Sequence, residues 1–178
     1  MRAFFAIEPP AQIKLAIDSW REKALPTFLK PVPPANFHIT LAFLGQVNEV
    51  QLDSLIQQSG ALTSTPGFQL SLDHLGYWPK PKTLWLGCQQ TAKQHVQLAD
   101  QLTKISLRSA IEMQKREYIP HLTLVRKCAE NPSAALIEPA FSFKVEEFHL
   151  FESVSTVSGV IYKRRFTWKL TPIMAINR

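Results

Sequence analysis

Phe37-His38-Ile39-Thr40-Leu41 is a short apolar stretch with two polar residues, and it returns 83 residues later as Pro120-His121-Leu122-Thr123-Leu124. In an extended strand, side chains two positions apart share one face. Each copy therefore presents a histidine and a threonine on one face and aliphatic residues on the other. The aliphatic face predicts burial against a core, which would hold the imidazole and the hydroxyl in fixed positions opposite it.

The segments around both copies indicate alternating strands and helices. Residues 2–7 form an apolar run typical of a strand, and Pro9 and Pro10 then begin a helix with apolar residues every three or four positions. Four prolines between residues 26 and 34 predict a surface connector. The other predicted helices lie near residues 52–56 and 92–109, and the other predicted strands lie at 37–44 (closed by Gly45), 68–72, 83–87, 120–126, 141–151 and 160–170.

This order of elements predicts an α+β fold. Because each copy of the motif follows a strand–helix half of comparable size, we expect a two-lobed protein with pseudo-twofold symmetry and one copy of the motif in each lobe. The composition shows no linker or low-complexity tract, so residues 1–178 are expected to form one domain made of two lobes.

The composition excludes several classes of protein. With 46% hydrophobic and 19% charged residues the chain is typical of a folded globular protein, and its net charge of +6 favours an anionic partner such as nucleic acid. Cys88 and Cys128 are too few for a disulfide framework or a zinc knuckle and suit a reducing cytosol. The apolar run at residues 3–7 is too short for a signal peptide, and no stretch is long enough to span a membrane. A soluble, cytoplasmic protein without a membrane partner is expected.

The two polar faces suit a phosphodiester substrate if they meet in one cleft. A neutral imidazole can accept a proton from water while a protonated one donates a proton to the leaving oxygen, since the ordinary pKa of histidine is about 6.5. The hydroxyls of Thr40 and Thr123 can donate hydrogen bonds to the non-bridging phosphate oxygens. This chemistry needs no metal ion or cofactor, and the residues alone leave open which of His38 and His121 is the acid.

A structural role is the main alternative for each of these residues. A single histidine on a strand is more often part of the core or of the surface than a catalyst, and one His-x-Thr tripeptide is a short motif. Two copies in the same aliphatic frame favour a shared function instead.

The two motifs resemble the duplicated His-x-Thr-x signature of the 2H (two-histidine) phosphoesterases. Almost the whole chain is similar to the RNA 2′,3′-cyclic phosphodiesterases of the LigT/ThpR group. Glu117-Tyr118-Ile119 departs from the Arg-Pro-Phe-like lead-in expected before the second motif. The similarity includes residues 2–7, 37–45, 84–87, 120–126 and 150–153 and a final strand containing Tyr162.

This resemblance implies a bilobal α+β fold of two pseudo-symmetric β-sheet lobes, with helices packed outside and the active site in a central cleft between the lobes. It also implies metal-free hydrolysis of a 2′,3′-cyclic phosphate at an RNA end, giving a 2′-phosphate. In that reaction His38 would donate a proton to the departing 3′ oxygen, and His121 would accept a proton from water. The same chemistry in reverse could join RNA halves through a 2′–5′ linkage, with a 5′-hydroxyl in place of water.

Arg126 is a candidate for binding the phosphate, because it resembles the arginine that often follows the second motif in this family. Strict alternation argues against it, since Arg126 is in phase with the aliphatic residues Leu122 and Leu124. Arg126 therefore reaches the cleft only if the strand ends or bulges there.

Trp85 and Tyr162 are candidates for binding the rest of the RNA. Trp85 could stack on a base, although a tryptophan at the centre of a strand is more often part of the core. Tyr162 leads the basic run at residues 163–165, which could follow the RNA backbone or could simply lie on an exposed strand edge.

The remaining histidines fall outside any repeated pattern. His95 is expected on the polar side of a helix and His74 near a turn, and with His149 they are interpreted as structural or solvated. Their spacings do not match a metal site such as His-x-x-x-His.

The sequence therefore predicts a monomeric RNA 2′,3′-cyclic phosphodiesterase that acts on tRNA fragments or oligonucleotides. One alternative keeps the site but uses a small cyclic nucleotide or another cyclic phosphate. A second alternative is a protein that binds RNA ends without catalysis.

Overall fold

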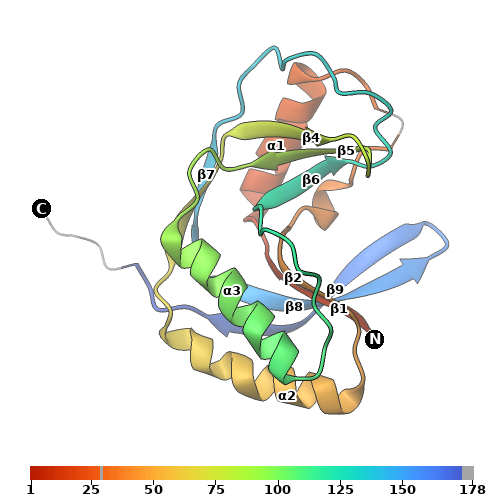
Figure 1. Cartoon of the computed structure of the whole chain (residues 1–178). Helices are drawn as coiled ribbons and strands as arrows, with labels where there is room; N and C mark the ends of the chain where they lie inside the picture. Colours follow the sequence, from red (N-terminus) through yellow and green to blue (C-terminus); the bar gives the residue numbers. More distant parts are fainter. Residues whose placement is uncertain (29, 174–178) are drawn as a thin grey trace, which may run out of the picture.

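The computed structural model describes residues 1–28 and 30–173 (Figure 1). Within them, seven strands form one sheet in the order β4-β5-β6-β2-β1-β8-β9, and β3 pairs with β7 in a second sheet. The strands are β1 (Arg2–Ile7), β2 (Ile39–Gln46), β3 (Phe68–Leu72), β4 (His74–Trp78), β5 (Thr83–Gly87), β6 (His121–Val125), β7 (Phe141–Val145), β8 (Glu147–Thr156) and β9 (Gly159–Lys169). The helices are α1 (Ala11–Ala24), α2 (Glu49–Ser59) and α3 (Lys93–Arg108), with short 3₁₀ turns η1 (Pro34–Asn36) and η2 (Gly60–Ser64).

The sequence repeat corresponds to a symmetric order of strands. The motif strands β2 and β6 are antiparallel neighbours in the middle of the large sheet, with β1 beside β2 and β5 beside β6. Helix α1 connects β1 to β2, and α3 connects β5 to β6. In the part of the chain that the structure describes, the two halves of the sheet meet at one residue pair, Ile39 with Leu122.

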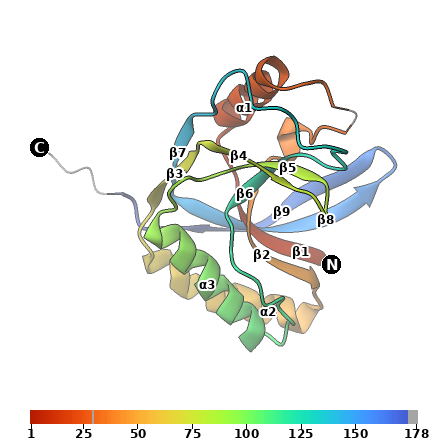
Figure 2. The same ribbon diagram turned by 45° about the horizontal axis from the view of Figure 1, so that its top comes forward.

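The helices pack outside the sheet on both halves. Helices α2 and α3 lie side by side against the half that contains β1 and β2 (Figures 1 and 2). The hydroxyl of Ser54 in the middle of α2 lies 2.9 Å from that of Ser109, the residue after α3. Helix α1 packs beside β6, where its buried Arg21 donates hydrogen bonds to the carbonyls of Val32 and Leu124 at 2.8 and 2.7 Å. The predicted bilobal α+β fold is confirmed.

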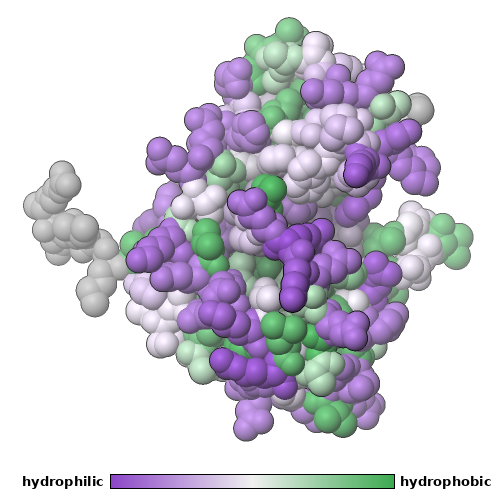
Figure 3. Space-filling model, in the orientation of Figure 1, coloured by the Kyte–Doolittle hydropathy of each residue, from purple (hydrophilic) through white to green (hydrophobic). Residues whose placement is uncertain are grey.

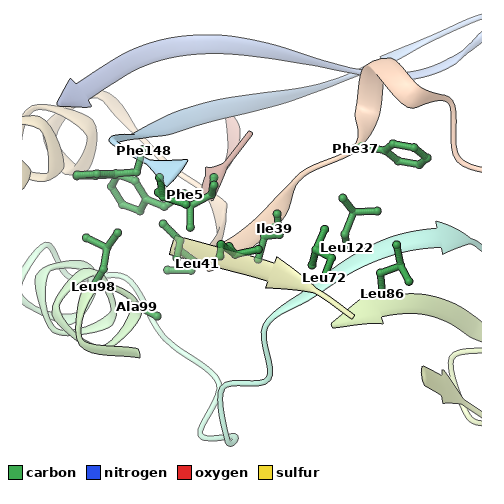
Figure 4. Close-up of a cluster of buried hydrophobic side chains, with 14 of the residues drawn as sticks. Phe5, Phe37, Ile39, Leu41, Leu72, Leu86, Leu98, Ala99, Leu122 and Phe148 are labelled. Carbon is green, nitrogen blue, oxygen red and sulfur yellow. The ribbon is translucent and has the colours of Figure 1, made fainter. Parts of the chain in front are cut away.

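One apolar core runs beneath both halves. Ile39, Leu41, Leu122 and Leu124, the aliphatic residues of the two motifs, are all at most 3% exposed. Burying one such side chain contributes about 1.5–3 kcal/mol, so the core holds both motif strands firmly. Figure 4 shows residues from strands of both halves together with Leu98 and Ala99 of α3.

Three local predictions differ from the structure. The strand predicted to close at Gly45 runs on to Gln46, because Gly45 lies in an irregular stretch of β2 with a φ of +71°. The single strand predicted at 141–151 is two strands, since the chain changes sheets at Glu146. Strand β4 was not predicted, because Gly76 interrupts a half-buried segment without clear alternation. The described helices are all too short or too polar to cross a membrane.

Candidate active site

The pairing of Ile39 with Leu122 brings the two motifs together on one face of the sheet. In this antiparallel register His38 lies opposite Thr123, and Thr40 lies opposite His121. The two histidines therefore occupy diagonal corners of a square of four residues, which we call the motif square. The Cα atoms of such diagonal neighbours are typically about 7–8 Å apart. All four side chains are half-buried. The register thus places both imidazoles and both hydroxyls on one face of the sheet.

Both imidazoles are oriented by the same local contact. His38 Nδ1 lies 2.8 Å from the carbonyl of Asn36, and His121 Nδ1 lies 2.8 Å from the carbonyl of Ile119. A carbonyl can only accept, so each Nδ1 carries a hydrogen and donates it. Nε2, on the far edge of each ring, is left for proton transfer.

The surroundings keep both imidazoles neutral in the free protein. The pKa of His38 is lowered from 6.5 to about 4, mainly by burial and also by the nearby charges of Arg126 and Lys14, while the hydrogen bond to the Asn36 carbonyl acts in the opposite direction. Burial also lowers the pKa of His121, with help from Arg116 and Arg126. A bound anion opposes both causes by favouring the charged imidazolium.

Aromatic rings form a wall around His38. Tyr162 of β9 meets the imidazole edge-on with ring centres 4.9 Å apart, and Phe4 of β1 lies 4.8 Å away. The side chain of Asn36 donates a hydrogen bond to the Val160 carbonyl at 2.8 Å, which ties the β8–β9 hairpin to the turn before His38. This hairpin projects at the right of Figure 1, and Figure 3 shows apolar side chains at its tip. The predicted Tyr162 is therefore next to His38.

Two indole rings form the wall beside His121. The ring centre of Trp78 on β4 lies 4.6 Å from that of His121. The ring centre of Trp85 on β5 lies 4.8 Å from that of Trp78 and 6.2 Å from that of His121. Trp85 is only 8% exposed, and a Cβ on Gly76 would be 2.2 Å from its ring. The indole of Trp85, a candidate for stacking on a base, is therefore mostly buried, whereas the indole of Trp78 is half-exposed. Sequence reasoning missed Trp78 because no strand was expected there.

Arg126 lies on the same side as the motif because β6 bulges. Thr123 pairs with Trp85 and Val125 pairs with Leu84, so Leu124 is an extra residue and the alternation shifts by one position. The displaced Leu124 carbonyl accepts hydrogen bonds from the Arg21 guanidinium and from the Val32 N–H at 2.9 Å. Arg126 is exposed and lowers the pKa of both motif histidines.

Arg116 is a second cation near His121 that sequence reasoning did not single out. It lies in the irregular segment between α3 and β6, and its charge lowers the pKa of His121. Its position depends on the tertiary course of that segment, so no motif in the sequence marks it.

Two residues of the predicted basic run are already paired. Arg164 binds Glu8, which also binds Lys14, and Arg165 lies 3.5 Å from Glu152. Glu8 lines the small pocket beside His38 and also a neighbouring pocket of about 750 Å³. Carboxylates therefore offset part of the positive charge of this strand.

The three remaining histidines lie outside the motif square. His149 is buried and contacts the Thr167 hydroxyl at 2.9 Å, and the ring of His74 meets Trp85 edge-on. His95 was expected on a polar helix face, but it is 1% exposed and bonded to the Tyr118 hydroxyl at 2.9 Å. Among the described residues, no group of three histidine, cysteine or acidic side chains could hold a metal ion.

A family model described as LigT-like phosphoesterase matches the chain twice, over residues 7–85 and 86–162. Each match contains one of the two His-x-Thr strands. The chain belongs to the LigT-like phosphoesterase family. The internal repeat of the sequence is therefore the repeat of this family.

Relatives of the LigT-like chain align over nearly its whole length. An RNA 2′,3′-cyclic phosphodiesterase of Escherichia coli is 36% identical over 96% of this chain and 97% of its own. One from Archaeoglobus fulgidus is 30% identical over 92% of this chain and 97% of its own. The crystal structure of E. coli LigT complexed with 3′-AMP superimposes with a TM-score of 0.88 at 36% identity, covering 96% of this chain and 98% of that one.

Proposed function

We propose that this protein hydrolyses the 2′,3′-cyclic phosphate at an RNA end to a 2′-phosphomonoester. The observation that carries the proposal is the diagonal pair of imidazoles, His38 and His121, each oriented through Nδ1 by a carbonyl. One phosphorus atom between them has one Nε2 on each side. The names of the relatives supply the class of substrate.

The reaction needs two proton transfers, one on each side of phosphorus. His121 Nε2 accepts a proton as water attacks phosphorus, and the P–O3′ bond breaks as His38 Nε2 donates a proton to O3′. The product is a 2′-phosphate with a free 3′-hydroxyl, and His121 then returns its proton to solvent while His38 regains one. Each transfer contributes typically ~10²–10⁴-fold to the rate.

The substrate itself supplies the protonation state that this cycle needs. His38 is neutral in the free protein, with a pKa of about 4, but it must start the reaction as the acid. The negative charge of the cyclic phosphate raises the pKa of a neighbouring imidazole. Binding of the anion therefore raises the pKa of both rings, and the proposed cycle begins from the state with the proton on His38 and with His121 neutral.

The other motif residues stabilise the phosphate. Thr40 and Thr123 occupy the remaining corners of the square, where their hydroxyls can donate to the non-bridging oxygens. Arg126, on the same side because of the bulge, adds a positive charge. Charge that develops on phosphorus-bound oxygen in the transition state is thus met by fixed donors.

The aromatic walls and the charge favour RNA over an isolated phosphate ester. Trp78 beside His121 and Tyr162 beside His38 offer ring surfaces for nucleotide bases. Stacking on such a ring contributes about 1–3 kcal/mol per base. With its net charge of +6, the protein is proposed to act as a cytoplasmic monomer on tRNA fragments or other RNA ends. The reverse reaction, 2′–5′ joining with a 5′-hydroxyl in place of water, uses the same groups.

The test is the product formed from an RNA oligomer that ends in a 2′,3′-cyclic phosphate, in EDTA. The proposal predicts a 2′-phosphate at the oligomer end. A 3′-phosphate would contradict the proposed direction of bond cleavage. Turnover of a cyclic mononucleotide but not of the oligomer would identify a small-molecule enzyme, and tight binding without product would identify an RNA-end binder.

A further inference from the structure

Tyr118 connects the segment before one motif to the strand of the other motif. Residues 109–120 form an irregular segment between α3 and β6, and Tyr118 lies in it three positions before His121. Its hydroxyl is 3.1 Å from the carbonyl of Thr40 on β2 and 2.9 Å from Nε2 of His95 on α3. A single phenol thus contacts elements from both halves of the molecule.

The direction of these two hydrogen bonds follows from the groups involved. The Thr40 carbonyl can only accept, so the Tyr118 hydroxyl donates its proton there. His95 Nε2 must then carry a hydrogen and donate it to the Tyr118 oxygen. Burial lowers the pKa of His95 to about 4, so the ring is neutral with its proton on Nε2, and burial raises the pKa of Tyr118, so the hydroxyl keeps its proton.

His95 is a rigid anchor for this link. It is 1% exposed, and its ring stacks on Phe68 of β3 with centres 5.2 Å apart and planes 21° apart. A ring that is buried and stacked in this way cannot follow the Tyr118 hydroxyl if the segment moves. His95 on α3 therefore fixes the position of the Tyr118 hydroxyl. The hydroxyl in turn fixes the distance between its own segment and the Thr40 carbonyl on β2.

The link bears on His121 in two ways. Ile119, the residue after Tyr118, supplies the carbonyl that orients the His121 ring. Thr40, whose carbonyl accepts from Tyr118, is the residue opposite His121 in the motif square. Within the described residues, β2 and β6 are paired at a single residue pair, Ile39 with Leu122. A further hydrogen bond between the segment before β6 and β2 therefore helps to set the distance between these two strands.

We propose that Tyr118, held by His95, is a positioning residue that sets the Ile119 carbonyl against the His121 ring and fixes the spacing of the two catalytic strands. This role rests on the proposed function, because it assumes that His121 transfers a proton. It was not implied by the resemblance, since Glu117-Tyr118-Ile119 is the part of the motif region that departs from the expected lead-in.

The decisive variant is Tyr118→Phe, which removes one oxygen atom and keeps the ring. We expect kcat for the cyclic-phosphate oligomer to fall about tenfold with KM nearly unchanged, because small displacements of a catalytic group are costly. The Ile119 carbonyl normally raises the pKa of His121, so a looser contact lowers that pKa, as NMR titration of the imidazole would show. An unchanged kcat together with an unchanged His121 titration would overturn the proposal.

Tyr77→Phe is the matched control. The Tyr77 hydroxyl also donates to a backbone carbonyl, that of Cys128 at 3.0 Å, but it does not touch a motif strand or the segment before His121. We expect this variant to keep the parent kcat and the parent His121 titration. An equal loss in both variants would mean that any missing phenolic hydroxyl has this effect, which would also overturn the proposal.

A second pair of variants tests the anchor without changing Tyr118. His95→Gln keeps an N–H donor that can reach the Tyr118 oxygen, whereas His95→Leu has none. The proposal predicts that the glutamine variant keeps more activity and a more nearly normal His121 titration than the leucine variant, and equal behaviour would contradict it. Failure of the proposed function itself gives a different result, because the parent protein and its His121→Ala variant would then turn over the oligomer equally.

Discussion

The two motif histidines, His38 and His121, share one backbone setting but differ in their surroundings. Both follow the same strand geometry, and both donate from Nδ1 to the carbonyl two residues earlier. His38 is enclosed by Phe4 and Tyr162, and its pKa is lowered to about 4. His121 has Trp78 beside it, and two arginines help to lower its pKa. Duplication of the motif has kept the orientation of the rings, while the surroundings make the two sites inequivalent.

The largest expected effect is the loss of either imidazole. His38→Ala and His121→Ala should each lower kcat by at least ~10²-fold, because each removes one of the two proton transfers. Circular dichroism should show the parent fold, since both side chains are half-buried and neither belongs to the apolar core. A variant that keeps full activity would remove that histidine from the mechanism.

A substrate with an activated leaving group distinguishes the two histidines. A p-nitrophenyl phosphodiester releases a phenolate that needs no proton, so loss of the general acid costs little there. If His38 is the acid, the loss of activity in His38→Ala on this substrate, relative to the parent protein, should be at least about tenfold smaller than the loss in His121→Ala. Recovery in His121→Ala alone would reverse the two roles.

The two aromatic walls are compared by removing one ring from each. Trp78→Ala and Tyr162→Ala should raise KM for an RNA oligomer while leaving kcat for a minimal cyclic phosphate nearly unchanged. Loss of one stacked base corresponds to about 1–3 kcal/mol, or roughly 5- to 150-fold in affinity. Equal KM values for the parent and for both variants would show that neither ring binds a base.

The smallest expected effect is on stability as a function of pH. A buried histidine with a lowered pKa destabilises the folded state when it is protonated, so its contribution is full above pH 6.5 and is lost as the pH falls towards about 4. His38→Ala should therefore lose less stability than the parent over this interval in urea denaturation experiments. Parallel pH curves would show that His38 is not shielded from water as the structure indicates.

Local patterns predicted the parts of the site that depend on local geometry. The alternation along the two motifs correctly put His38 and Thr40 on one face and Ile39 on the buried face. The period of a strand is a property of the strand itself, so it can be recognised without knowing its neighbours. The helices could be predicted from their apolar period for the same reason.

The remaining features of the site depend on contacts between distant segments. The bulge that moves Arg126 to the motif face is satisfied by Arg21 and Val32, which are about a hundred residues earlier in the chain. Trp78 covers Trp85 only because β4 pairs with β5. His95 is buried because the irregular segment after α3 folds back and brings Tyr118 to it. Such contacts leave no periodic pattern in the sequence.

The central claim is that both imidazoles act on one phosphorus atom from opposite sides. A crystal structure with a nucleoside vanadate, which mimics the five-coordinate transition state, tests it directly. The account predicts His38 Nε2 and His121 Nε2 each within about 2.6–3.2 Å of an apical oxygen, one on each side of the vanadium. A complex in which only one of the two rings reaches the bound group would contradict it.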